Sequence, residues 1–358
     1  MWPDRRLIDL FDIEFPFVLA PMAGAMDAEL AIAVARGGGL ASLPCAMLTA
    51  DKAREQVGIF RQQVSAPINL NFFCHTPVAA DPAREAVWKQ RLGGYYQEFG
   101  IDPAAPVAGA NRAPFDAAMC ELVEELKPAA VSFHFGLPEE PLLRRVKDAG
   151  CIVLASATIV REAIWLEERG ADLIIAQGAE AGGHRGMFLT DSIAEQPGLF
   201  ALLPQVVDAV RVPVIAAGGI ADGRGIAAAM ALGASGVQIG TAYLRCPESR
   251  ISAPARAALA QATDASTVIT NGMTGRPARG VANRVMREIG PVSADAPAFP
   301  HAATALGPLK AAAEQQGRTD FTNLWAGQAV RLGRDMPAAE LTRALAGAAL
   351  ARLSRLAG

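Results

Sequence analysis

The sequence lacks the features that mark several common classes of protein. Its net charge is only −3 over 358 residues, so no excess of positive charge attracts nucleic acid or an anionic membrane. No apolar run approaches the roughly 18 residues that a membrane-spanning helix needs. The N-terminal stretch carries several acidic side chains and no apolar segment typical of a signal peptide. We therefore predict a cytoplasmic protein without nucleic-acid or membrane partners.

Cysteine and histidine are also scarce, and their spacing argues against two kinds of site. The five cysteines are an odd number without a CxxC pair, which disfavours a disulfide framework or a zinc site. The four histidines have no metal-ligand spacing and no accompanying carboxylate cluster, so we predict no metal. We interpret the cysteines as small buried hydrophobic residues, and Cys45 and Cys74, which follow predicted strands, leave a redox role open.

The chain does contain a regular alternation of apolar runs and amphipathic stretches. Hydrophobic residues make up 51% of the sequence, enough for a large core. The runs are apolar throughout, as in parallel strands that are buried on both faces. Eight such units predict a (β/α)8 barrel, and the alternative, a doubly wound open sheet, lacks a GxGxxG motif after its first strand. The predicted strands are 17–22, 40–44, 68–73, 129–135, 151–157, 173–178, 213–219 and 236–241.

Two stretches do not fit a simple barrel. Residues 1–244 are predicted to form the barrel with an insertion at about 75–127. Residues 245–358 are predicted to hold the last barrel helix and an appended, mostly helical subdomain over the active-site face. The alanine-rich helix expected at 337–357 is interpreted as ordinary packing or an oligomer contact, and a homodimer is possible.

Active sites of such barrels lie at the carboxyl ends of the strands. Strands seven and eight end in AAGGI (216–220) and QIGT (238–241), where glycines leave backbone N–H groups unshielded. This arrangement predicts a phosphate site, although the glycines alone also suit tight turns. The backbone of APM (20–22) and the amides of Asn71 and Gln177 suit the ring of flavin mononucleotide (FMN). Alternatively, Asn71 caps a strand and Gln177 is a buried amide satisfied by neighbouring backbone.

Several motifs together resemble one enzyme family. VLAPMAG, INLNFFCH, AQGAEAGGHRG, NGMTGRPARG and TDFTNLWAGQAV are similar to motifs of nitronate monooxygenases, formerly 2-nitropropane dioxygenases, of the class acting on propionate 3-nitronate. The resemblance implies an FMN-dependent barrel enzyme with a catalytic histidine, His184, inside AEAGGHRG (179–186). It also implies flavin contacts from Met22, Asn71, Gln177, Gly182, Gly218, Gly219, Gln238, Ile239, Gly240 and Thr241.

An imidazole suits the chemistry that the resemblance implies. Forming a nitronate removes a proton from the carbon of a nitroalkane, and a group with a pKa near neutrality matches this task. His184 is therefore predicted to be the base for neutral nitroalkanes, with flanking glycines that let it approach the flavin. Oxidation with O2 would then give a carbonyl compound and nitrite. The alternative is a histidine that merely caps its loop.

The predicted substrate contacts depart from the family pattern, since the tyrosines expected from the resemblance are missing from FPHAATALGPLK (299–310). Phe299 stands where a tyrosine is expected, while Lys310 remains and His134 ends the fourth strand. Arg276 and Arg279 offer charge but are expected to be solvated loop residues. The main alternative function is an FMN-dependent NAD(P)H reductase of quinones or enoyl thioesters. An IMP-dehydrogenase-like enzyme is disfavoured because no cysteine follows the sixth strand, and a flavin-binding protein without turnover is a further alternative.

Overall fold

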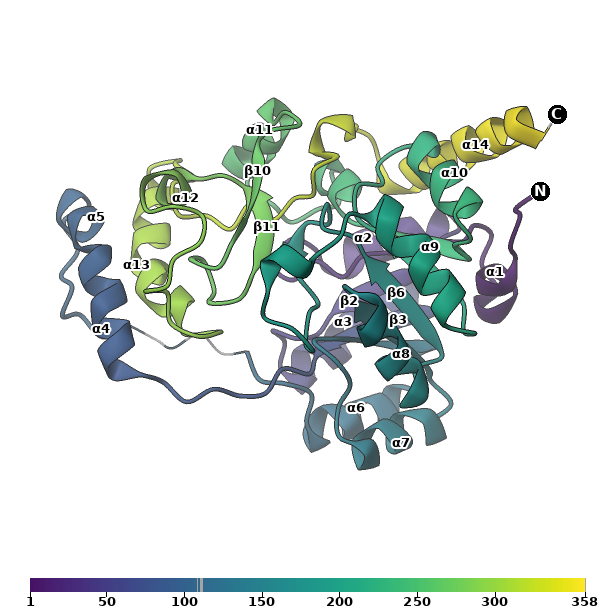
Figure 1. Ribbon diagram of the computed structural model, residues 1–358, viewed down its shortest axis with the longest axis horizontal. Helices are drawn as coiled ribbons and strands as arrows, with labels where there is room; N and C mark the ends of the chain where they lie inside the picture. The colour runs from purple at the N-terminus through teal and green to yellow at the C-terminus, as the bar shows by residue number, and fades with distance from the viewer. Residues whose placement is uncertain (108, 110–111, 358) are drawn as a thin grey trace.

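The computed structural model describes residues 1–107, 109 and 112–357, and its centre is a parallel eight-stranded sheet (Figure 1). Neighbouring strands follow the order β1-β9-β8-β6-β5-β4-β3-β2. β1 and β2 meet through the Leu40 N–H bond to Phe17 O (2.8 Å) and the Leu19 N–H bond to Leu40 O (3.0 Å), which closes the barrel. The predicted barrel is confirmed. Its strands are β1 (Phe17–Leu19), β2 (Ala41–Pro44), β3 (Ile68–Phe73), β4 (Ala130–His134), β5 (Ile152–Ala157), β6 (Leu173–Gln177), β8 (Val214–Ala217) and β9 (Gly236–Ile239).

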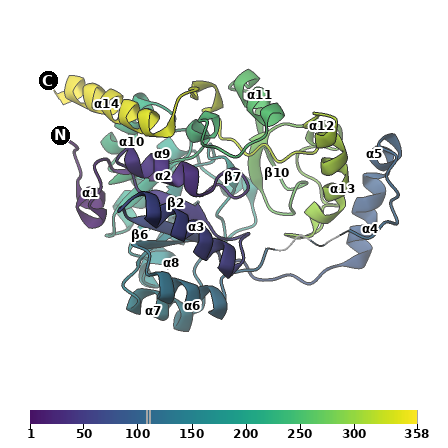
Figure 2. The same ribbon diagram turned by 180° about the vertical axis from the view of Figure 1, so that it is seen from behind.

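The last helix of the barrel is the C-terminal helix of the chain. α14 (Ala338–Ala357) packs against α10 (Gly223–Ala231) and α2 (Ala28–Arg36), and Figures 1 and 2 show the three helices together. A Cβ at Gly223 would lie 2.5 Å from the Ala348 carbonyl carbon, so glycine is needed for this close approach. The other surrounding helices are α3 (Ala50–Gln63), α6 (Ala117–Leu126), α7 (Glu140–Asp148), α8 (Val160–Glu168) and α9 (Leu199–Ala209).

The amino end of the barrel is closed by α1 (Arg6–Phe11). Leu7 and Phe11 are buried together with inward-facing strand residues such as Val18, Leu154 and Ile175. Apolar contact of this kind stabilises the closed end by roughly 25 cal/mol per Å² of buried surface. The opposite, carboxyl end is therefore the open end at which a ligand has access.

A second unit, which we call the cap, covers the carboxyl end and has its own hydrophobic core. It comprises residues 82–101 and 267–325, and both views show α4 and α5 beside α13, far from the two termini. The Trp88 indole N–H donates to Ala302 O (3.2 Å), and the Tyr96 hydroxyl donates to Ala305 O (2.7 Å). Its elements are α4 (Pro82–Arg91), α5 (Gly93–Glu98), β10 (Thr267–Thr270), β11 (Ala278–Val281), α12 (Arg284–Glu288) and α13 (Ala302–Gln315).

The hydrophobic clusters do not follow the expected boundary at residue 244. Part of the insertion at 75–127 belongs to the cap core, whereas α14 belongs to the barrel core. Residues 108, 110 and 111 of that insertion lie outside the described residues. The cap is also less purely helical than expected, because β10, β11 and β7 (Gly183–His184) form an antiparallel sheet. The sequence analysis missed this sheet, since its strands are short and β7 lies in a glycine-rich stretch.

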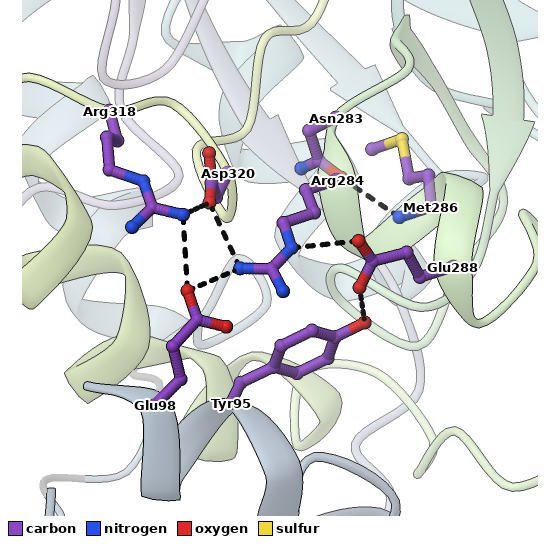
Figure 3. Close-up of polar contacts among 8 residues, drawn as sticks. All are labelled: Tyr95, Glu98, Asn283, Arg284, Met286, Glu288, Arg318 and Asp320. Carbon is purple, nitrogen blue, oxygen red and sulfur yellow. Dashed lines mark hydrogen bonds and ion pairs between the residues drawn. The ribbon is translucent and has the colours of Figure 1, made fainter. Parts of the chain in front are cut away.

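Ion pairs fasten the insertion to the rest of the cap (Figure 3). The Arg284 guanidinium lies 2.8 Å from Glu98 of α5 and 2.9 Å from Glu288 of α12. Tyr95 donates to Glu288 (2.8 Å), and Asp320 lies 3.5 Å from Arg284. Each pair is partly exposed and worth little alone, but together they hold α5 against α12.

Two further observations bear on the sequence predictions. In the part of the chain that the structure describes, no helix is both long and apolar enough to span a bilayer. All five cysteines carry free thiols, and four of them are buried. The interpretation of most cysteines as small core residues is confirmed, while Cys74 is only partly buried.

Candidate active site

A cavity of about 480 Å³ lies at the carboxyl ends of the strands, between the barrel and the cap. Its size is that of a typical cofactor or ligand pocket. Twelve of the residues singled out in the sequence line it, and they come from strand ends far apart in the chain. These residues are Met22, Asn71, His134, Gln177, Gly182, His184, Gly218, Gly219, Gln238, Gly240, Thr241 and Lys310.

Two predicted residues do not line the cavity. Ile239 is fully buried in the barrel core, and its carbonyl accepts the Ala20 N–H (2.9 Å). Successive strand side chains point to opposite faces, so its neighbour Gln238 faces the cavity and Ile239 does not. Phe299 is buried behind the wall, with its ring centroid 5.4 Å from that of His184. It therefore supports His184 rather than contacting a ligand directly.

His184 is held by hydrogen bonds from three directions. Its Nε2 lies 2.9 Å from the Thr274 hydroxyl, while its carbonyl accepts from Gln177 Nε2 (3.0 Å) and His134 Nε2 (3.1 Å). Burial, together with the positive charge of Arg112, holds the pKa of the His184 imidazole well below its ordinary value. The ring is therefore neutral. If Nε2–H donates to Thr274, Nδ1 is the nitrogen with a free lone pair.

Glycines near His184 serve the packing of the chain rather than the approach of a ligand. A Cβ at Gly182 would lie 2.6 Å from the backbone of Ala326 and Gly327. A Cβ at Gly186 would lie 2.9 Å from His134 Cε1, and Gly183 has a φ of +77°. The loop thus needs glycine to pass beneath the cap segment and beside His134. At Gly183 an added Cβ would meet open space, so the expectation that glycine lets His184 approach the flavin stays a prediction there.

The two predicted amides orient their surroundings. Gln177 Oε1 accepts the Gly186 N–H (2.8 Å), while its Nε2 donates to the His184 carbonyl. Asn71 Nδ2 donates to the hydroxyl (3.0 Å) and the carbonyl (3.2 Å) of Ser132. Gln177 is therefore a buried amide whose hydrogen bonds are made with neighbouring backbone, as the alternative interpretation stated. A contact of Gln177 or Asn71 with a ligand stays a prediction.

The turns after β8 and β9 have the geometry of an anion site. Gly218 and Gly219 have φ values of +115° and +67°, which side-chain-bearing residues rarely adopt. Among the described residues, no acceptor pairs with the N–H groups of Gly218, Gly219, Gly240 or Thr241. All four residues line the cavity, and unpaired backbone N–H groups at such turns are a common device for binding phosphate.

One buried polar atom in the wall lacks a partner. Gln238 Oε1 is inaccessible to solvent and, within the described part of the chain, makes no hydrogen bond. An unpaired buried acceptor lowers the stability of the fold by roughly 1–3 kcal/mol, so such an atom normally accepts a hydrogen bond from the protein, from water or from a ligand. A ligand N–H in the cavity would satisfy it.

The sequence is similar to those of known enzymes over almost its whole length. The family described as "Nitronate monooxygenase" matches residues 4–347. A nitronate monooxygenase of Paraburkholderia phytofirmans is 43% identical over 344 residues, which cover 95% of this chain and 94% of that protein. One of Pseudomonas aeruginosa is 42% identical over 342 residues, covering 95% and 97%. The chain belongs to the nitronate monooxygenase family.

A solved structure supports the same assignment. Nitroalkane oxidase of Streptomyces ansochromogenes superposes with a TM-score of 0.89 at 37% identity, covering 98% of this chain and 99% of that one. The resemblance inferred from the motifs is thereby confirmed, as is the fold. This member of the nitronate monooxygenase family is an enzyme, an oxidoreductase that acts on a small molecule.

Two arginines of this nitronate monooxygenase family member are less exposed to solvent than predicted. Arg276 and Arg279 were expected to be solvated, but the first is partly buried and the second is buried, with 8% of its surface exposed. Arg276 donates to Met187 O (2.8 Å) and stacks on Phe135, and Arg279 donates to Ala179 O (2.7 Å). Their hydrogen bonds hold loops around the cavity, because a buried guanidinium must find acceptors.

The sequence analysis also missed Arg185, which is wholly buried beneath the His184 loop. Its guanidinium donates to Gln177 O (2.7 Å), Gly178 O (2.6 Å) and Gln196 Oε1 (3.0 Å). Burial lowers the pKa of Arg185 to about 10, so it remains charged at neutral pH. Its position directly after His184 could have drawn attention to it, but only the fold shows that it joins the end of β6 to the His184 loop.

Replacing Arg185 with methionine is expected to lower the free energy of unfolding by about 3 kcal/mol, because two buried carbonyls and one partly buried amide oxygen lose their donor. Urea denaturation of the purified protein measures this. Arg144→Met is the matched control, since Arg144 is 68% exposed and forms an ion pair with exposed Glu140; its expected loss is under about 1 kcal/mol. Equal losses for both variants would show that the Arg185 hydrogen bonds contribute nothing.

Proposed function

We propose that the enzyme oxidises alkyl nitronates with O2 to a carbonyl compound and nitrite, that FMN is its cofactor, and that propionate 3-nitronate is its preferred substrate. The observation that carries this proposal is that the neutral imidazole of His184 lines the cavity at the carboxyl ends of the strands. A neutral imidazole removes a proton from an acidic carbon, and the cationic Lys310 and Arg112 in the same wall favour the resulting anion.

The residues present fit FMN. The N–H groups of Gly218, Gly219, Gly240 and Thr241, for which the described residues offer no acceptor, would hold its phosphate, and Gln238 Oε1 would accept a ring N–H. The predicted ring contacts of Met22, Asn71, Gln177 and Gly182 come from the same cavity wall. When bound, FMN would supply the redox chemistry, taking electrons from the substrate and delivering them to O2.

His184 and its neighbours would act on the substrate directly. We assign proton removal from a neutral nitroalkane to His184 Nδ1, with Thr274 fixing the other ring nitrogen. His134 uses Nδ1 on the Ser156 hydroxyl (3.1 Å) and Nε2 on the His184 carbonyl, so it positions His184. Lys310, which projects from α13 and is 43% exposed, would attract the carboxylate of propionate 3-nitronate.

The test is to incubate the FMN-loaded enzyme aerobically with propionate 3-nitronate and with ethyl nitronate, recording oxygen uptake and nitrite. We expect both signals with both substrates, with the higher kcat/KM for propionate 3-nitronate because it carries a second negative charge. If neither nitronate yields nitrite, the proposed function is wrong. A higher kcat/KM for ethyl nitronate would reject only the substrate assignment.

A further inference from the structure

The guanidinium of Arg112 lies in the wall of the cavity that holds His184. Its Cζ atom is 5.5 Å from the centroid of the Phe299 ring, and the centroid of the same ring lies 5.4 Å from that of the His184 imidazole. Burial lowers the pKa of Arg112, but its ordinary value is so high that the group stays charged. A cation is thus held on an aromatic surface close to the imidazole.

Arg112 differs from the other cations at the cavity because it has no negative partner among the described residues. Arg250 is paired with Asp27 (2.5 Å) and Glu29 (3.8 Å), and Lys310 lies 3.9 Å from Glu314. For Arg112, no ion pair and no hydrogen bond from its guanidinium is found in the described part of the chain. A largely buried guanidinium without a counter-ion is costly, so a bound anion would stabilise it.

We infer that Arg112 binds the anionic substrate, taking a planar group with two oxygens on one atom through its paired N–H donors. Nitronates and carboxylates both have this geometry, and the planar fork of arginine matches it in a way that lysine does not. The inference rests on the proposed function in one respect: it assumes that the ligand of the cavity is such an anion.

Phe299 explains how the Arg112 guanidinium can take the role of an anion-binding group in this cavity. The sequence has phenylalanine where a tyrosine is expected, so no phenolic hydroxyl is available at this position to bind a substrate oxygen. The same ring instead provides an apolar face on which the Arg112 guanidinium rests. Stacking restricts the side chain without using its N–H donors, which leaves them free for an anion.

Nitrite provides a binding test that does not depend on turnover, because it is a planar two-oxygen anion. Titration calorimetry of the FMN-loaded enzyme with sodium nitrite is expected to show a Kd that rises about 10- to 100-fold in Arg112→Met. Arg112→Lys is expected to recover only part of this loss, since it restores charge but not the fork. Arg250→Met, which removes an already paired cation of the same cavity, is expected to change the Kd less than about twofold.

Kinetics then identify which oxygen pair Arg112 holds. A rise in KM for both ethyl nitronate and propionate 3-nitronate in Arg112→Met supports the inference and assigns the nitronate group. A rise for propionate 3-nitronate alone supports it and assigns the carboxylate. Unchanged nitrite affinity and unchanged KM values, in a variant with the urea midpoint of the parent, would overturn it. If the parent binds nitrite but oxidises no nitronate, the proposed function fails while the anion site stands.

Discussion

Replacing His184 with asparagine is expected to lower kcat/KM for nitroethane by roughly 10²- to 10⁴-fold, while kcat/KM for ethyl nitronate falls less than about tenfold. Nitroethane must lose a proton from carbon before it can be oxidised, whereas ethyl nitronate arrives already deprotonated. Asparagine can still reach the Thr274 hydroxyl, but it cannot accept a proton. Oxygen uptake with the two substrates measures the separation.

The preformed nitronate is the internal control in this experiment. A fall of the same size with both substrates would mean that His184 shapes the cavity and is not a base. The pH profile gives a second check, since the pKa of His184 lies well below its ordinary value. We expect kcat/KM for nitroethane to be level from pH 8 to pH 7 and to fall only in more acid solution, as the imidazole gains a proton.

The folded protein is expected to lose stability between pH 7.5 and pH 5. Burial lowers the pKa values of His75 and His134 to about 4, whereas the unfolded chain has ordinary values near 6.5. Below pH 6.5 the unfolded chain therefore binds protons that the folded chain excludes, and the free energy of unfolding falls. At pH 5 the solution is about 1.5 pH units below the histidine pKa of the unfolded chain. The free energy of unfolding is therefore lower by about 2 kcal/mol for each of the two histidines.

Urea denaturation at both pH values measures this loss. His134→Gln removes one titrating ring and keeps a side chain able to reach Ser156, so its loss on acidification is expected to be about 2 kcal/mol smaller. Cys151→Ser, a change at a buried site of the barrel, is expected to reduce stability equally at both pH values. A parent protein with the same urea midpoint at pH 7.5 and pH 5 would contradict the prediction.

Most of the barrel could be predicted because each strand is marked by a short apolar run in the sequence. Runs such as 151–157 and 173–178 are apolar throughout, and the observed strands Ile152–Ala157 and Leu173–Gln177 differ from them by about one residue at an end. The carboxyl ends of parallel strands must meet at one edge, so residues separated by up to about 200 positions could be assigned to one cavity. That is why His184 and Gly218 were found together.

The rest depended on contacts between distant segments. α4 and α5 read as an insertion in the barrel, but Trp88 and Tyr96 are buried against α13, more than 200 residues further along the chain. α14 was not recognised as the last barrel helix, because a whole subdomain separates it from β9. Arg112 had no motif to single it out, and only its place on Phe299 gives it a role.

The side-chain direction of Ile239 could also have been predicted. It was grouped with Gln238, Gly240 and Thr241 because the motif is continuous, yet strand geometry turns alternate side chains to opposite faces. The side chain of Ile239 therefore lies in the barrel core. Applying the two-residue period within QIGT would have separated it from its neighbours before the fold was known.

The most direct test of the central claim is anaerobic absorbance spectroscopy of the FMN-loaded enzyme. The claim is that the cavity places a nitronate, and not a nicotinamide, next to the bound flavin. We predict that propionate 3-nitronate changes the flavin spectrum at once, whereas NADH or NADPH changes it slowly or not at all. Rapid bleaching by NADPH with no response to any nitronate would contradict the account and favour the reductase alternative.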